Sequence, residues 1–349
     1  MRKWAVAITA ALLLLSGCSD KETAVEPEKE VKEVEPVEEV VEEDPTPYQF
    51  PLTGVASAEE TDGRAVAVMI NNHPKARPQS GLHKADFVYE ILAEGDVTRF
   101  LAVFQSEEPE NIGPVRSARD YYIELAKGLN ALYIAHGYSP EAKQMLESGY
   151  IDNLNGIVYD GTLFQRSSSR VAPHNSYITY DNILKGVDQR NYSMEESPPK
   201  FTYMAEEDKT TITGNEASSV MITYSGSSIS DSIFEYDASL GKYKRFFSGG
   251  LQTTDLESNE PVLVDNVFII ETSHRVIDSE GRKEIDFKSG GKGYLIQMGK
   301  VIEVEWKNEN GTLVPMKDGA PAPLVPGKTW VNVMPSNPGI LSSISFNAN

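Results

Sequence analysis

The sequence predicts an α+β fold, with a mixed α/β N-terminal domain packed with a mostly antiparallel β C-terminal domain. In the first half, short apolar runs alternate with segments that carry helix-start signals. From residue 216 onward, short β-type runs recur between turns rich in Gly, Asn and Ser, without a long amphipathic helix. The chain has 349 residues, 40% of them hydrophobic, which gives room for two domains with cores of their own.

Five segments are expected along the chain. They are a signal peptide at 1–18, an acidic disordered tether at 19–47, the α/β domain at 48–190, a connecting segment at 191–215 and the β-rich domain at 216–345. The connecting segment begins with the polar, proline-containing run NYSMEESPPK, which is typical of a domain boundary.

The amino-terminus has the features of a secretory signal. Arg2 and Lys3 precede an apolar run that ends in Leu-Ser-Gly-Cys, and this ending resembles a bacterial lipobox. We therefore expect Cys18 to carry lipid, palmitate included, and to become the first residue of the mature chain. Because Cys18 is the only cysteine, the mature protein is expected to lack a disulfide framework, a thiolate metal site and a cysteine nucleophile. The expected location is the extracytoplasmic face of the cell membrane.

The segment after Cys18 is strongly acidic. From 19 to 44 it holds twelve Asp or Glu residues against three Lys, a net charge of −9, and it has no aromatic residue. Such a composition favours a solvated tether. Removing this −9 and the +2 of the signal from the total of −20 leaves −13 for residues 45–349, which opposes binding to nucleic acid.

The stretch IGPVRSARDYYIELAK, residues 112–127, carries the main candidate site. Ser117 and Asp120 have the spacing of a capping box, which predicts Ser117 as the N-cap, Arg119 as the second helical residue and Arg116 just outside. Cations are unfavourable at a helix N-terminus, by about 0.3–1 kcal/mol each. The arginines and the free amides of the first turn could together bind a phosphate, sulfate or carboxylate. The alternative is that both arginines pair with acidic side chains and only fix the helix.

The two segments before this helix contribute further candidates. The run 65–70 is predicted as a buried strand that ends at Asn71 and Asn72, with Arg77 in the following loop, and these polar groups could converge on a ligand. The runs 86–92 and 97–105 predict a hairpin. If Glu94 and Gly95 are the two turn residues, Glu90 faces Arg99 across the pair, and we expect a buried ion pair there rather than a catalytic one.

Beyond the helix, the run 131–135 is predicted as a strand with His136 at its carboxyl end, where ligands collect in sheets whose strands alternate with helices. Ser139, Pro140 and Gly149 delimit a predicted helix, and 156–159 is predicted as a strand. His174 follows in a turn with Asn175, so it joins the candidates. None of these histidines has metal-ligand spacing, so neither a metal nor a cofactor is expected.

In the second half, six strands are predicted, at 220–224, 243–247, 266–271, 293–297, 301–306 and 329–334. Met298 and Gly299 are expected to turn the hairpin between the fourth and fifth of these strands. The triplet Gly327-Lys328-Thr329 imitates the end of a phosphate-binding loop, but it lacks the leading glycine and runs into a strand, so no phosphate site is expected there.

Several motifs resemble the YerB-like family of Gram-positive bacterial lipoproteins. They are PLTG, VMINNHPKARPQSGL, FVYEILAEGDVTRFLAVFQS, IGPVRSARDYYIELA, AHGYSPEA, APHNSYITY, DNVFII, GKGYLIQMGKVIEVEWK and LVPGKTWVNVMP, which span most of the chain from Pro51 to Pro335. The resemblance implies a lipid-anchored extracytoplasmic protein with a two-part α/β architecture. The family has no assigned function, so the resemblance transfers no catalytic residues.

Three functions are compatible with these patterns. The first is a membrane-tethered binding module for an anionic cell-envelope component or a partner protein, using Arg116, Arg119 and the amides of their helix. The second is a cell-envelope hydrolase acting on glycan or phosphodiester bonds, with His136 or Glu90 as general base. The third is an assembly factor that docks to envelope synthases through its β domain. The sequence shows no nucleophile elbow, metal cluster or triad that would favour the hydrolase.

Overall fold

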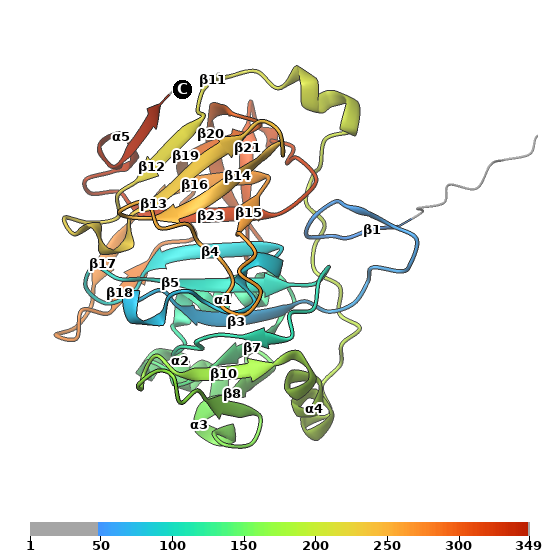
Figure 1. Cartoon of the computed structure of the whole chain (residues 1–349), viewed down its shortest axis with the longest axis vertical. Helices are drawn as coiled ribbons and strands as arrows, with labels where there is room; N and C mark the ends of the chain where they lie inside the picture. The colour runs from blue at the N-terminus through green and yellow to red at the C-terminus, as the bar shows by residue number, and fades with distance from the viewer. Residues whose placement is uncertain (1–47, 348–349) are drawn as a thin grey trace, which may run out of the picture. The chain divides into compact units, whose positions relative to one another are not determined.

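The computed structural model describes residues 48–347, so Cys18 and the acidic segment lie outside the described residues. The described residues form one compact unit. Its central element is a 12-stranded sheet with the order β22-β21-β20-β19-β16-β23-β4-β5-β3-β7-β8, to which β11 adds beside β20 (Figure 1). The α+β fold class is confirmed.

The central sheet takes strands from both halves of the sequence. The first half supplies β3 (Val66–Asn71), β4 (Phe87–Leu92), β5 (Thr98–Phe104), β7 (Leu132–Ala135) and β8 (Asn153–Asn155). The second half supplies β11 (Asn215–Glu216), β16 (Asn266–Thr272), β19 (Gly291–Gln297), β20 (Lys300–Glu309), β21 (Thr312–Lys317), β22 (Ala320–Pro321) and β23 (Thr329–Pro335).

The halves meet at β23, which pairs in parallel with β16 on one side and with β4 on the other. β3, β7 and β8 are also parallel to one another, and β5 is antiparallel to both β4 and β3. In the stretch of the sheet from β16 to β8, every strand except β5 therefore points in one direction, and the carboxyl ends of these strands lie along one edge. We call this the carboxyl edge.

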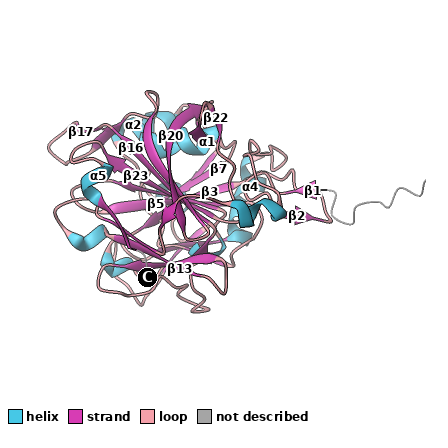
Figure 2. Ribbon diagram, turned by 90° about the horizontal axis from the view of Figure 1, so that it is seen from above, coloured by secondary structure: helices cyan, strands magenta, loops and turns pink. Residues whose placement is uncertain are grey.

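Other elements cover the two faces of the central sheet. One face packs on α1 (Asp120–Gly128) and α2 (Pro140–Glu147), which bury Tyr122 and Leu146 against it. The other face packs on a five-stranded antiparallel sheet and on α4 (Tyr180–Arg190). Figure 2 shows α1 and α2 on the opposite side of the central strands from β13. The five-stranded sheet consists of β15 (Leu263–Val264), β14 (Lys242–Phe247), β13 (Ser232–Asp237), β12 (Ser219–Ile222) and β24 (Ile344–Asn347).

Short elements complete the unit. They are β1 (Tyr48–Gln49), β2 (Ala56–Ser57), β6 (Asn111–Ile112), α3 (Gly156–Tyr159), β9 (Phe164–Arg166), β10 (Ser176–Thr179), β17 (His274–Val276), β18 (Lys283–Ile285), α5 (Ile340–Ser343) and four 3₁₀ turns. β6, β10 and β9 form a three-stranded sheet, and β17 pairs with β18 in a hairpin.

The predicted strands of the second half are all present, and Met298 and Gly299 turn the β19–β20 hairpin, both with positive φ. The predicted helix after Ser139 is confirmed, since the Ser139 side chain accepts from the Ala142 N–H and Pro140 is its first residue. The strand predicted at 156–159 is wrong. That segment is the short helix α3, because the Asn155 side chain accepts from the Ile157 N–H and starts a helical turn.

Candidate functional site

The arginine-bearing stretch begins its helix later than the capping-box spacing predicts. α1 starts at Asp120 with Arg119 as N-cap, so the prediction of Ser117 as N-cap is wrong. The reason is tertiary. The Ala118 N–H donates to the Gly137 carbonyl, and the His136 N–H donates to the Arg116 carbonyl, which keeps residues 116–118 extended beside the end of β7. Ser117 instead donates its Oγ–H to the His136 carbonyl at 3.2 Å.

Arg99 and Arg119 share one carboxylate, that of Glu94. Arg99 Nη2 lies 2.5 Å from Glu94 Oε2, and Arg119 Nε lies 2.5 Å from Glu94 Oε1. The predicted pairing of Glu90 with Arg99 is therefore wrong. The hairpin closes through the Ala93 N–H and the Val97 carbonyl, so three residues form its turn instead of two. This places Ile91 opposite Arg99 and turns the Glu90 side chain to the other face.

Arg116 lies between the ends of β3 and β7. Its N–H donates to the Met69 carbonyl at 2.9 Å, and its carbonyl accepts from the His136 N–H at 2.9 Å. Its guanidinium is partly exposed, and within residues 48–347 we find no hydrogen-bond or ion-pair partner for it. Burial, followed by the charge of Arg99, lowers the pKa of Arg116 to about 10. The arginine cluster (Arg99, Arg116, Arg119) therefore holds three cations around the single carboxylate of Glu94.

Two stacked imidazoles lie close enough to Arg116 for its charge to act on their pKa values. The ring centroids of His73 and His174 are 4.6 Å apart with an interplanar angle of 27°. Burial lowers the pKa of both rings, and the charge of Arg116 contributes to each shift. His73 Nδ1 accepts from the Lys75 N–H at 3.1 Å. His174 Nδ1 accepts from Asn71 Nδ2 at 2.9 Å, because Asn71 Oδ1 already accepts from the His73 N–H.

This hydrogen bonding fixes the tautomer of both rings. Each Nδ1 faces an obligate N–H donor, so the neutral ring carries its proton on Nε2. The two Nε2–H groups have no partner among the described residues, and they are available as donors beside the Arg116 guanidinium. The site thus offers donors from one cation and two neutral rings, which is the pattern that an oxyanion requires.

His136 has a different environment. Arg166 Nη2 donates to His136 Nε2 at 2.9 Å, so His136 Nδ1 carries the proton and donates to Ser176 Oγ at 2.7 Å. Arg166 is held in turn by Asp160, at 2.9 Å. Burial and then the Arg166 charge lower the pKa of His136. Both ring nitrogens are therefore engaged, and His136 supports the edge of the site without a free basic nitrogen.

The structure does not bring Glu90, Asn72 and Arg77 to this site. Glu90 is 0% exposed and lies on the opposite face of the sheet, where it forms an ion pair with Arg245 at 3.0 Å. Asn72 Nδ2 donates to Glu90 and to Thr98. Arg77 donates to the Asn72 and Ile229 carbonyls and stacks on Phe247, and burial lowers its pKa to about 10. Glu90 and Arg77 thus join the first half of the unit to the second, and Asn72 holds both side chains in place.

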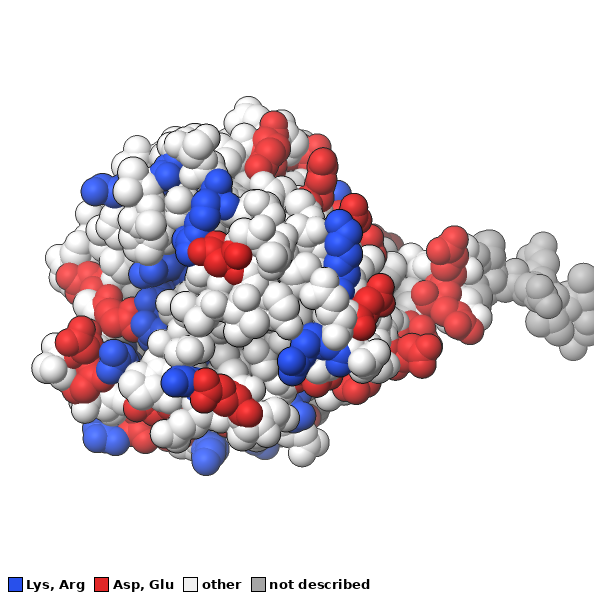
Figure 3. All heavy atoms as spheres, turned by 90° about the horizontal axis from the view of Figure 1, so that it is seen from below, with Lys and Arg blue, Asp and Glu red and all other residues white. Residues whose placement is uncertain are grey.

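The remaining predicted residues gather at the carboxyl edge: Asn71, Arg99, Arg116, Ser117, Arg119, His136 and His174. We call Arg116, His73 and His174 the Arg116 site. No sequence pattern selected His73 or Glu94 as a site residue, although the adjacent Asn71-Asn72 pair marked the loop that holds His73. Figure 3 views the molecule from the side of α3 and shows a row of basic side chains on that face.

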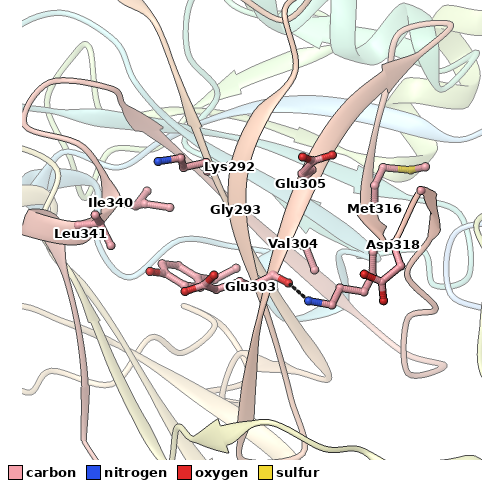
Figure 4. A pocket seen from close by; sticks show the side chains of 12 residues that line it. Lys292, Gly293, Glu303, Val304, Glu305, Met316, Asp318, Ile340 and Leu341 are labelled. Carbon is pink, nitrogen blue, oxygen red and sulfur yellow. Dashed lines mark hydrogen bonds between the residues drawn. The ribbon is translucent and has the colours of Figure 1, made fainter.

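Three cavities are found elsewhere on the unit. One of about 540 Å³ lies over β19, β20 and β21, and α5 forms its wall with Ile340 and Leu341 (Figure 4). Its floor carries the cross-strand pairs Lys292–Glu305 and Tyr294–Glu303, as expected for a solvated sheet face. A second, of about 880 Å³, adjoins α1, and a third, of about 380 Å³, lies at the C-terminal end of α1.

Two features are absent from the described residues, 48–347. We find no group of three or more His, Cys, Asp or Glu side chains placed to hold a metal ion in this part of the chain. None of the helices in the same range combines the length and the apolar composition that crossing a membrane requires.

Comparisons with known proteins agree with the motif resemblance. Residues 52–193 match the N-terminal domain, and residues 220–331 the C-terminal domain, of a family described as protein of unknown function (DUF3048). The chain is 43% identical over 339 residues to YerB of Bacillus subtilis (strain 168), which is named as a lipoprotein, and the match covers 96% of each chain. The crystal structure of YerB from Bacillus subtilis is similar with a TM-score of 0.79 and 44% identity, covering 86% of this chain and 100% of that chain.

Proposed function

Because this chain belongs to the DUF3048 family of YerB-like proteins, whose function is unknown, we propose a function from its own geometry. It is an extracytoplasmic binding module, anchored to the membrane by lipid at Cys18. It holds an oxyanion of a cell-envelope component or partner protein between Arg116 and the stacked His73 and His174. The observation that carries the proposal is the partly exposed Arg116, whose guanidinium makes no hydrogen bond or ion pair with a described residue.

Electrostatics supports an anionic ligand at this point. The arginine cluster has three guanidinium groups and one carboxylate, Glu94, so its local charge is +2 in a protein region that carries −13. Burial alone would raise the pKa of Glu94, but Arg99 and Arg119 outweigh it and lower the pKa, so this carboxylate stays ionised. A bound anion would offset the positive charge of Arg116 that no carboxylate pairs with.

The hydrogen-bond donors of the site support an oxygen ligand. The Nε2–H groups of His73 and His174 are donors when the rings are neutral, and a guanidinium donates through several N–H groups in a fixed plane. A phosphate, sulfate or carboxylate accepts from all of them. A neutral amide or an ammonium group would leave donors unpaired or facing like charge, so such ligands are disfavoured.

The site offers little support for the hydrolase alternative. Its general-base candidates are Glu90, which is fully buried in an ion pair, and His136, whose Nε2 accepts from Arg166.

The lipid anchor is a separate part of the proposal. It predicts that Cys18→Ala releases the chain from the membrane fraction, and a variant that stays fully membrane-bound contradicts the anchor alone.

The binding proposal is tested by calorimetric titration of the full-length chain in detergent with inorganic phosphate and with acetate. We expect Arg116→Ala to weaken binding at least tenfold, since a charge-assisted hydrogen bond contributes about 1.5–3 kcal/mol. The matched control is Arg190→Ala, which removes an exposed guanidinium at the end of α4. Equal affinity of Arg116→Ala and the wild type for both anions, or no binding of either anion by the wild type, would refute the site.

A further inference from the structure

A second binding site lies in the cavity of about 880 Å³ beside α1, which we call the α1 cleft. Its walls come from α1, from Tyr150 after α2, from the β17–β18 hairpin and from the β20–β21 turn. It therefore lies between the segments that match the two family domains. Junctions of this kind are frequent ligand sites. No residue of the Arg116 site lines the α1 cleft, so an inference about it is independent of the proposed function.

The floor of the α1 cleft is apolar and partly aromatic. Tyr121, Ile285 and Phe287 line it and are buried in the core below. Tyr150 stands at its side with 40% of its surface exposed. The Tyr150 hydroxyl donates to Glu124 Oε2 at 2.8 Å, which holds the ring against α1. The aromatic surface that the cleft presents to a ligand is therefore mainly that of Tyr150, whose ring is pre-oriented by this hydrogen bond.

The rim of the α1 cleft is polar, and its side chains form hydrogen bonds within the protein through some of their polar atoms. Glu124 accepts from Tyr150 through Oε2, and its other oxygen has no partner among residues 48–347. Asp286 Oδ1 accepts from the Lys288 and Ser289 N–H groups, which fixes this carboxylate at the rim. Asn308 Oδ1 accepts from the Gly311 N–H at 2.7 Å, which leaves its Nδ2 as a donor. The internal bonds of Glu124 and Asn308 therefore fix each side chain and leave one of its polar atoms for a ligand.

We propose that the α1 cleft binds a carbohydrate. A sugar ring has an apolar face of C–H groups that packs on aromatic side chains, and hydroxyls that both donate and accept. The fixed carboxylate oxygens accept from such hydroxyls, and the Asn308 amide donates to them. Phosphorylated or sulfated ligands fit poorly, because Asp120, Glu124, Glu284 and Asp286 place four carboxylates around the cleft against Arg275 and Lys288. The sugar is therefore neutral or carries an amine.

The test uses the full-length chain in detergent, with cellotetraose as a neutral probe and chitosan tetrasaccharide as an amino-sugar probe. Saturation-transfer NMR and calorimetry measure binding. We expect at least one of these probes to bind, and we expect Tyr150→Ala and Asn308→Ala each to weaken binding about tenfold. The control is Tyr48→Ala, because Tyr48 in β1 is 39% exposed and does not line the cleft.

Tyr150→Phe tests whether the ring itself binds the sugar, since this variant keeps the ring and removes only the hydrogen bond to Glu124. We expect it to bind the sugar within about threefold of the wild type. The inference is overturned if neither oligosaccharide binds, or if Tyr150→Ala and Asn308→Ala bind as tightly as the Tyr48→Ala control. It is also overturned if trilysine binds in the α1 cleft more tightly than both sugars, because the cleft would then act as a cation site.

Discussion

The buried ion pair between Glu90 and Arg245 gives the sharpest test of how the two halves of the unit are held together. Both side chains are 0% exposed, and the Arg245 guanidinium also lies over the Trp330 ring at 4.6 Å. The Glu90 carboxylate accepts from five side chains: Asn72, Thr98, Ser232, Arg245 and Trp330. These donors come from β5, β13, β14 and β23 and from the loop after β3.

Glu90→Gln removes the charge and places an NH₂ group against these donors. Arg245 is then a buried cation without a counterion, and such a loss costs about 3–5 kcal/mol. A loss of 1 kcal/mol lowers the midpoint of thermal unfolding by roughly 2–4 °C in domains of 150–250 residues, and the lower end of that range applies to a larger unit. The midpoint of Glu90→Gln should therefore fall by about 6–10 °C. The measurement is thermal unfolding followed by circular dichroism, with urea unfolding as a second estimate.

Asp160→Asn is the matched control, because it breaks an Arg–carboxylate pair on the surface. We expect it to cost less than about 1 kcal/mol. The double change Glu90→Leu with Arg245→Leu should cost less than Glu90→Gln alone, since no unpaired charge remains. If Glu90→Gln unfolds within 1 °C of the wild type, the pair does not hold the halves together and the reasoning fails.

Three further predictions concern the carboxyl edge and pH. Glu94→Gln leaves the arginine cluster without a carboxylate, so the variant should be destabilised by roughly 3 kcal/mol in chloride buffer and partly rescued by sulfate; a stability independent of sulfate contradicts this. Gly156→Ala would place a Cβ 2.1 Å from His136 Nδ1, so we expect a lower thermal midpoint and an altered imidazole tautomer by ¹⁵N NMR, and an unchanged tautomer argues against the packing. Burial lowers the pKa of His274 from 6.5 to about 4, so the folded state favours the neutral ring and loses stability as the pH falls from about 6.5 to 4. In His274→Gln, the free energy of unfolding measured with urea should depend less on pH over that window. A pH profile as steep as that of the wild type would contradict the prediction.

Local patterns predicted the strands and the α2 helix because their signals lie within a few residues. The predicted register of the hairpin at Glu90 was wrong, because the sequence Ala-Glu-Gly-Asp fits a turn of two residues or of three. One additional turn residue changes which side chains share a face of the pair. The prediction of Ser117 as the N-cap was wrong because main-chain hydrogen bonds to Gly137 and His136 hold this segment extended and outweigh a local cap. These competing bonds join distant segments, which no spacing reveals.

The sequence pointed to Arg116 and His174 as candidates at the carboxyl edge, but not to their neighbour His73 or to the side-chain pairs around them. Strands followed by polar turns placed Asn71 and His136 at one edge, as the parallel topology then required. The partner of Glu90, in contrast, is Arg245, which lies 155 positions away in a strand of the other half. The His73–His174 stack is equally non-local. Side-chain pairs of this kind depend on the register of strands that the sequence leaves open.

The position of β23 has a consequence for the order in which the molecule assembles. The facing edges of β4 and β16 stay unpaired until residues 329–335 are in place, and these residues are synthesised after both strands. Until then each presents a row of open main-chain groups on buried, apolar strands, which is a template for joining another chain. Closing this gap requires contacts across more than 200 residues, so folding is expected to be slow and sensitive to C-terminal truncation. A chain that stops before Thr329 should therefore aggregate, whatever the state of its first half.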